Sequence, residues 1–295
     1  IDQLFVSEKK QVVVSNESMS VLQITAECNP FIKTGGLADV VGGLATEYSK
    51  LGLPSTVIMP LYPSIKEKYG LLLEIKSSLK IEYDNKDFKV DLYILLDQNT
   101  TFYFIDQYKF FERDDIYGYE DDGDRFAFFS KACVALLPAL NSYPDIIHIH
   151  DWHMGLIPML LKENNLDIKT LMTIHNIQYQ GIHDAQIIKK LGIKQKVKKT
   201  QGMINFMELG LSSATIISTV SETYKDELQY EYYSKNLVEI INKRERDLYG
   251  ILNGLNIDIS PEKDLEIVSR YDSLNVFENK KLNKLDLQKK KKPEE

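Results

Sequence analysis

The sequence predicts an α/β fold with a Rossmann-like, open and mostly parallel sheet that carries helices on both faces. Two patterns lead to this prediction. Apolar, strand-like runs alternate along the chain with segments in which apolar residues recur at helical spacing. Several runs, such as DIIHI and LMTI, are almost continuously apolar, which is typical of parallel strands buried on both faces. Strands that alternate with helices imply βαβ units and therefore an open α/β sheet.

The predicted elements follow these runs in order. The strands lie at residues 21–26, 55–59, 90–96, 101–105, 145–149, 170–174 and 215–219. The third and fourth runs are joined by DQNT and predict a β-hairpin. Helical spacing predicts helices over 37–51, 125–140 and 154–162. Gly52 is expected to end the first helix, and Ser221 to start a further one.

The composition excludes several classes of protein. With 43% hydrophobic and 27% charged residues, the chain has the composition of an ordinary globular protein. Its net charge of −7 argues against a nucleic-acid partner. No apolar run approaches the roughly 20 residues that cross a bilayer, so we expect no membrane partner, and the N-terminus lacks the pattern of a signal peptide. The two cysteines, Cys28 and Cys133, favour a reducing compartment over a disulfide scaffold.

A lysine and two glycines follow the first predicted strand, in the stretch KTGGLADV. Gly35 and Gly36 have no Cβ, so a ligand can approach the backbone closely. The N-terminus of the next helix offers free N–H groups, and Lys33 adds a positive charge, so the stretch favours phosphate. The alternative is a tight turn with a solvated lysine. Asp39, in the first helical turn, either complements the helix dipole or points toward a ligand hydroxyl.

All five histidines lie between residues 148 and 183. His148 and His150 share one face of a predicted strand, and we interpret His148 as a core histidine rather than a metal ligand. Asp151, Trp152 and His153 follow that strand and are expected to face a cleft. The next strand is followed by His175 and Asn176 in the same layout. His175 is a candidate for proton transfer or for holding a hydroxyl.

Carboxylates cluster before the helix predicted at 125–140. Asp121, Asp122 and Asp124 precede or follow Gly123 in the stretch DDGDRF. They either cap the helix or bind sugar hydroxyls, since carboxylates accept strong hydrogen bonds. The residues alone do not decide between these two roles.

Five motifs in order resemble one family, the bacterial glycogen synthases and plant starch synthases, which are glycosyltransferases of the GT-B fold. The motifs are KTGGLADV at 33–40, HDWH at 150–153, TIHN with YQG at 173–181, TVS at 219–221 and LNG at 252–254. Together they cover roughly residues 19–290, and their order makes chance agreement improbable.

The resemblance implies a reaction. Such enzymes transfer glucose from a nucleotide sugar, usually ADP-glucose, to the non-reducing end of an α-1,4-glucan (glycogen or starch), with retention and without a metal or other cofactor. By the match, His175 and Asp121 are the expected catalytic residues. The nucleotide sugar is assigned to Lys33, Gly35 and Gly36, and the glucan side of the cleft to Asp39, Trp152, His153 and Asn176. The location expected is the cytoplasm, or the plastid in a plant or alga.

The chain departs from the family in two respects. The usual Asp-Asn of the acidic loop is Asp121-Asp122 here, which makes the loop more negative. Family enzymes also have a second Rossmann-like domain that binds most of the nucleotide. We therefore expect an N-terminal extension at 1–18, the acceptor-side catalytic domain at 19–270, and the start of an interdomain linker at 271–295. The C-terminal domain is expected to be absent from this chain, and is a possible partner on a separate or truncated chain.

Two other functions fit the sequence. The aromatic stretch 102–119 suits a non-catalytic α-glucan-binding module, since aromatic rings stack on sugars, although core packing explains some of these residues equally well. The other is a related GT-B nucleotide-sugar transferase with a different acceptor.

Overall fold

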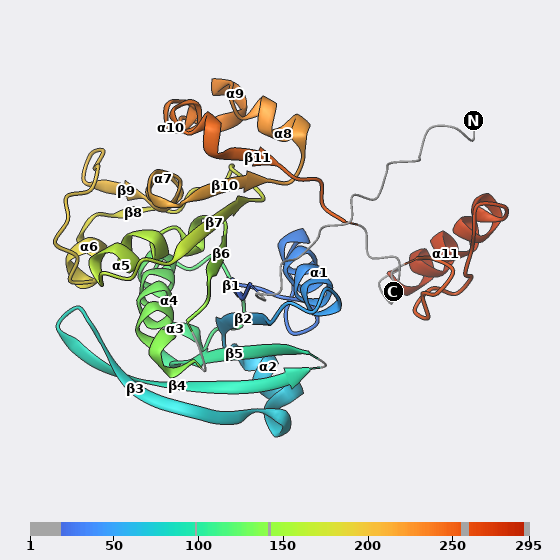
Figure 1. Ribbon diagram of the computed structural model, residues 1–295. Coiled ribbons are helices and arrows are strands. Elements are labelled where there is room, and N and C mark those ends of the chain that lie inside the picture. Colours follow the sequence, from blue (N-terminus) through green and yellow to red (C-terminus); the bar gives the residue numbers. More distant parts are fainter. Residues whose placement is uncertain (1–18, 98, 141–142, 255–259, 292–295) are drawn as a thin grey trace. The chain divides into compact units, whose positions relative to one another are not determined.

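The computed structural model describes residues 19–97, 99–140, 143–254 and 260–291 (Figure 1). The chain forms two compact units that divide between Asn253 and Gly254. Within the described ranges, none of the helices has the length and apolar character needed to cross a membrane. The extension predicted at 1–18 lies outside the described residues. The domain predicted at 19–270 and the linker predicted at 271–295 stay predictions.

The first unit is built on a nine-stranded sheet with the order β11-β10-β7-β6-β1-β2-β5-β4-β3. The central strand β1 pairs in parallel with β2 on one side and β6 on the other. The strands from β11 to β5 are parallel, and β4 and β3 add an antiparallel edge. The bounds are β1 (Val21–Ile24), β2 (Ser55–Pro60), β3 (Glu74–Tyr83), β4 (Lys86–Asp97), β5 (Thr100–Asp106), β6 (Ile146–His150), β7 (Lys169–Ile174), β10 (Ile216–Thr219) and β11 (Leu248–Gly250).

Helices cover both faces of this sheet. In Figure 1, α1 lies on one face, and α4, α5 and α7 lie on the other. The helices are α1 (Gly36–Lys50), α2 (Pro63–Tyr69), α3 (Tyr108–Phe111), α4 (Asp122–Leu136), α5 (Ile157–Glu163), α6 (Gln186–Lys190), α7 (Phe206–Ser213), α8 (Glu222–Glu227), α9 (Glu231–Ser234) and α10 (Val238–Lys243), with α11 (Val276–Lys290) in the second unit. Strands β8 (Ile182–Asp184) and β9 (Met203–Asn205) form a separate antiparallel pair, with α6 between them in the sequence.

The predicted fold class is confirmed, and so are one predicted hairpin, one predicted helix end and one predicted helix start. The predicted hairpin is β4 and β5, with Asp97 opposite Thr100. Gly52 follows α1 with a φ of 75°, a left-handed conformation that glycine adopts without strain. The Ser221 side chain accepts a hydrogen bond from the Tyr224 N–H at 3.0 Å and caps α8, as its position before a helical pattern predicts.

Other predicted elements differ from those observed. Strand β3 was not predicted, because its mostly exposed residues lack the apolar signal of the buried strands. The helix predicted at 154–162 begins at Ile157, because residues 152–154 form a 3₁₀ turn and Gly155 packs against the Phe206 backbone. The helix predicted at 125–140 is α4, which begins earlier and ends before a 3₁₀ turn containing Pro138.

Alanine substitutions at Gly42 and Gly43, two adjacent glycines of α1, would test how closely this helix packs on the loop after β1. A Cβ on Gly42 would lie 2.4 Å from the Asn29 carbonyl oxygen, whereas one on Gly43 would have nothing within 4 Å. We expect Gly42→Ala to lower the free energy of unfolding by about 1–3 kcal/mol. Gly43→Ala should raise it by up to about 1 kcal/mol, because alanine favours a helix. Urea unfolding of both variants measures the difference, and equal effects would contradict the packing.

Candidate active site

Several predicted site residues lie on the loops that follow β1, its neighbour β6 and the next strand β7. The chain leaves β1 toward β2, while β6 lies on the other side of β1. Loops that leave two adjacent parallel strands in opposite directions mark the place where open α/β sheets bind ligands. The loop after β1 carries Lys33, the loop after β6 carries Asp151, and the loop after the next strand, β7, carries His175.

The Lys33 side chain is paired with Asp39 of α1. Its Nζ lies 2.6 Å from Asp39 Oδ2, and the two side chains are 50% and 33% exposed. An exposed pair of this kind contributes only about 0–1 kcal/mol to stability. Lys33 can therefore exchange Asp39 for a stronger anion at little cost.

The buried carboxylate of Glu27 organises the glycine turn. It accepts hydrogen bonds from the backbone N–H of Thr34 and, at 3.3 Å, from that of Gly35. Burial raises the pKa of Glu27, and the two backbone bonds act in the opposite direction. Of the residues that the sequence assigned to a phosphate, Gly35 thus already has an acceptor for its N–H group. The backbone of Gly36 is open on its Cβ side, because a Cβ there would meet nothing within 4 Å. The roles of Gly35 and Gly36 stay predictions.

Asp151 fixes the backbone of the next loop. It has a φ of 55°, and its Oδ1 accepts from the N–H of His175 at 2.8 Å and of Asn176 at 3.3 Å. Its side chain is buried, and burial raises the pKa of the carboxyl to about 7. Asn176 is exposed, and its side chain accepts from the Gln178 N–H at 3.0 Å. Asp151 therefore connects the ends of β6 and β7.

The ring of His175 is held by a second histidine. His150 Nδ1 lies 3.0 Å from His175 Nε2. Burial lowers the pKa of His175 to about 4, so this imidazole is neutral at neutral pH and can form hydrogen bonds without carrying a charge. His148 is buried, with its Nε2 2.6 Å from Thr173 Oγ1, so the interpretation of His148 as a core histidine is confirmed.

The side chains of Trp152 and His153 are more buried than we expect of residues that face a cleft. They are 8% and 7% exposed, respectively. The Tyr117 ring stacks on His153 with centroids 4.6 Å apart, and Gly181 leaves room beside Trp152. Tyr117 also lies near Glu27, whose charge adds to burial in raising the Tyr117 pKa. The tyrosine thus connects the acidic loop with both neighbouring strand ends. Glucan binding by Trp152 and His153 stays a prediction.

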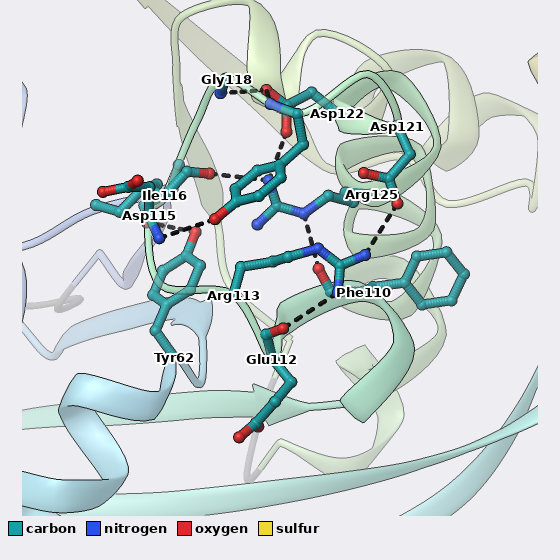
Figure 2. Close-up of polar contacts among 12 residues, drawn as sticks. Tyr62, Phe110, Glu112, Arg113, Asp115, Ile116, Gly118, Asp121, Asp122 and Arg125 are labelled. Carbon is teal, nitrogen blue, oxygen red and sulfur yellow. Dashed lines mark hydrogen bonds and ion pairs between the residues drawn. The ribbon is translucent and has the colours of Figure 1, made fainter.

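The acidic loop is built around a buried arginine (Figure 2). Arg125 of α4 is fully buried, pairs with Asp122, and donates to the carbonyl oxygens of Phe110 at 2.8 Å and Ile116 at 3.0 Å. Asp122 Oδ2 accepts from the N–H of Gly118 at 2.8 Å. Asp122 therefore shapes the loop that precedes α4.

The other two carboxylates have separate partners. Asp121 forms an ion pair with Arg113, with Oδ2 and Nη2 3.1 Å apart, and its side chain is 43% exposed (Figure 2). Asp124 accepts from the Tyr83 hydroxyl and pairs with Lys190. Of the three side chains, that of Asp121 is the most exposed, since those of Asp124 and Asp122 are 29% and 9% exposed. The catalytic role of Asp121 stays a prediction. In the described part of the chain, no three His, Cys, Asp or Glu side chains are grouped to hold a metal ion.

The comparisons with known proteins agree with this arrangement. Residues 20–243 match the family model described as the starch synthase catalytic domain. The chain belongs to this family. It is 38% identical over 283 residues to a glycogen synthase of Anoxybacillus flavithermus and 39% identical over 288 residues to one of Clostridioides difficile. Each alignment covers 92% of this chain, but only 58% and 60% of those two relatives.

A solved member of the family has the same fold. The catalytic domain of starch synthase IV from Arabidopsis thaliana, bound to ADP and acarbose, superposes with a TM-score of 0.81 at 28% identity. The match covers 92% of this chain and 59% of that domain. This chain therefore spans about three-fifths of the length of its relatives.

Three residues that organise the site were missed or undervalued in the sequence. Glu27 is a carboxylate at the end of a mostly apolar run, and a carboxylate that is buried there requires a hydrogen-bonding partner. His150 stands at a strand end, but only the sheet places it beside His175. Tyr117 lies in an aromatic stretch and had no distinguishing signal.

Ionisation of buried Asp151 should destabilise the fold. Its pKa is raised to about 7, so the folded chain holds this proton more tightly than the unfolded chain does. Asp151 therefore loses its stabilising effect as pH rises from about 4 to 7. The difference in free energy of unfolding, wild type minus Asp151→Asn, should fall over this range by on the order of 4 kcal/mol, since each pKa unit corresponds to about 1.4 kcal/mol.

Asp145→Asn provides a control of opposite sign. Hydrogen bonds from Ser20 lower the pKa of Asp145, so its contribution is lost as pH falls rather than as pH rises. Chemical unfolding at a series of pH values measures both differences. A wild-type minus Asp151→Asn difference that does not change with pH would contradict the burial of an ionising carboxyl.

Trp152, the single tryptophan of the chain, reports on its own packing. A Cβ on Gly181 would lie 2.1 Å from the Trp152 ring, whereas one on Gly192 would have nothing within 4 Å, and both glycines have positive φ. Gly181→Ala should therefore shift the fluorescence emission to longer wavelength as the ring is displaced. Gly192→Ala, which introduces only the backbone strain of about 1–2 kcal/mol, should leave the emission unchanged. Identical spectra for the two variants would contradict the contact.

Proposed function

We propose that this chain is the acceptor-side part of a retaining glucosyltransferase. The reaction would move glucose from ADP-glucose, or another nucleotide-glucose, to the 4-hydroxyl at the non-reducing end of an α-1,4-glucan. The observation that carries the proposal is the position of Lys33 and His175 on loops that follow β1 and β7, next to the place where loops leave β1 and β6 in opposite directions. The chain that forms this sheet matches the starch synthase catalytic domain. The relatives named glycogen synthase, and the starch synthase bound to ADP and acarbose, support this choice of substrates.

The departing nucleoside diphosphate gathers negative charge, and in this proposal Lys33 stabilises it. Lys33 would leave its exposed pair with Asp39 and contact the diphosphate, with the open face of Gly36 allowing close approach. Stabilisation of this kind requires no strong general acid, and the proposal includes no metal or other cofactor. Asp39, once released, would be free to accept a hydrogen bond from a sugar hydroxyl.

His175 would contact the transferred glucose through its neutral ring, and Asp121 would accept hydrogen bonds from the glucan. Asn176, Trp152 and His153 would contribute to the glucan side of the same site. Residues beyond those matched here would supply most of the nucleotide site, since the relatives are longer than this chain. In this proposal those residues form a second domain, on the same chain or on a separate one. The family and the reduced, buried cysteines support a cytoplasmic location.

Transfer should depend on a second domain and on Lys33. We expect glycogen labelling from ADP-glucose to be weak with the 295-residue chain and strong when the missing part of a glycogen synthase relative is fused to it. In the fusion, Lys33→Ala should lower kcat by about 10²–10³-fold, the usual cost of losing one donor to a developing charge.

Lys50→Ala is the matched control, because it also removes an exposed pair of α1, that with Glu47. Equal activity of the Lys33 and Lys50 variants would contradict the role of Lys33. Glucan binding in affinity electrophoresis without turnover by the fusion would instead favour a glucan-binding module. Turnover restricted to other donors or acceptors in a substrate panel would favour a different transferase.

A further inference from the structure

The imidazole rings of His150 and His175 share a hydrogen bond, and either ring nitrogen could carry its proton. His150 is the last residue of β6, and it lies opposite Thr173 of the parallel strand β7. His175 follows Thr173 by two residues, so the two imidazoles point to the same side and meet with His150 Nδ1 and His175 Nε2 3.0 Å apart. One of these nitrogens must donate and the other must accept.

Both rings carry a single proton at neutral pH. Burial lowers the pKa of His175 to about 4 and that of His150 well below its usual range. Burial and the neighbouring histidines, with ring centroids of His148 and His150 4.1 Å apart, disfavour a charge on His150. Two arrangements of the two protons remain, and they differ in which nitrogen of His175 carries N–H.

The surroundings of His150 distinguish the two arrangements. Its Nε2 is buried, and no described residue lies within hydrogen-bonding distance of it. If His175 donated, the proton of His150 would be on this Nε2 as a buried N–H without an acceptor. If His150 donates from Nδ1, Nε2 is an unprotonated nitrogen, and buried acceptors without partners are more common than buried donors without partners.

We propose that His150 is a positioning residue that donates from Nδ1 to His175 Nε2, and so fixes His175 as the tautomer with its proton on Nδ1. The remaining ring nitrogen of His175 then presents an N–H donor. With the backbone of His175 held by Asp151 and its ring held by His150, this donor has a fixed direction. Its partner is an oxygen acceptor of the bound sugar donor, and this assignment rests on the proposed function.

The same reasoning assigns the neighbouring network. His148 Nδ1 is buried and has no partner among the described residues, so His148 donates from Nε2 to Thr173 Oγ1. The Thr173 hydroxyl is also hydrogen-bonded to the Ser218 hydroxyl, with the two oxygens 2.7 Å apart. This second network ends at Ser218 and does not include His175, so His148 provides a matched control on the same face of β6.

The tautomer is measured on the folded 295-residue chain by long-range ¹H–¹⁵N NMR of labelled histidines, with His175 assigned from the spectrum of His175→Gln. The expected result for His175 is a protonated, pyrrole-type Nδ1 and an unprotonated, pyridine-type Nε2. A protonated Nε2 on His175 in the wild type would overturn the proposal, whatever the activity of the protein.

Two substitutions test the cause. His150→Asn keeps an amide donor near the position of Nδ1 and should preserve the His175 tautomer, whereas His150→Leu removes the donor and should move the His175 proton to Nε2. His148→Gln should leave His175 unchanged. The same His175 tautomer in the Asn and Leu variants would show that His150 does not set it, and the wild-type spectrum decides the tautomer even if a variant does not fold.

The fused enzyme described above provides a second readout. His150→Leu should lower kcat by up to about 10²-fold with little change in KM for the glucan, and His150→Asn should restore part of the loss. Failure of the fusion to transfer glucose would contradict the proposed function but not the tautomer. A correct tautomer together with unchanged kcat in His150→Leu would overturn the positioning role alone.

Discussion

The site depends on the parallel pairing of β1 with two neighbours whose connections run in opposite directions. Because β2 and β6 flank β1, the loops after β1 and β6 part at the same edge of the sheet. Side chains from residues more than a hundred positions apart in sequence, such as Glu27 and Asp151, come close enough to affect each other's ionisation. A change in strand order would separate them, whatever the local conformation of each loop.

Buried polar groups then give each loop a defined shape. Glu27 holds the backbone of the glycine turn, Asp151 holds the backbone of His175, and Arg125 holds the acidic loop. Each of these charged side chains is costly to bury. Hydrogen bonds with backbone groups replace those that the side chain would make with water and so offset this cost. Side chains that hold the loops are thus buried, while Lys33 and Asp121, which are proposed to contact ligand, keep exposed ion pairs.

This division has an electrostatic consequence. The histidines near the site are kept neutral by burial, and the carboxyl of Asp151 is pushed toward its neutral form. In the proposed function, it is therefore Lys33, and not the neutral imidazole rings, that meets the negative charge of the diphosphate. A neutral His175 is suited to directional hydrogen bonding, which depends on the tautomer and not on the net charge.

Most strands of the sheet and the polar loops that follow them could be predicted from the sequence, because apolar periodicity and glycine, serine and aspartate signals are local properties of the chain. Runs such as DIIHI predict buried parallel strands, and HDWH and TIHN predict polar strand ends without any structure. The edge strand β3 escaped this reasoning, since an exposed strand needs few apolar residues.

Which polar groups are hydrogen-bonded to one another could not be predicted, because it depends on how the chain folds in space. Glu27 acts on Thr34 and Gly35, and His150 acts on His175 across two strands, through contacts that no spacing along the chain specifies. The enclosure of Trp152 and the separate partners of Asp121, Asp122 and Asp124 arise in the same way. The physical reason is that hydrogen bonding and burial act over distances of a few ångströms in space, which the order of residues alone does not define.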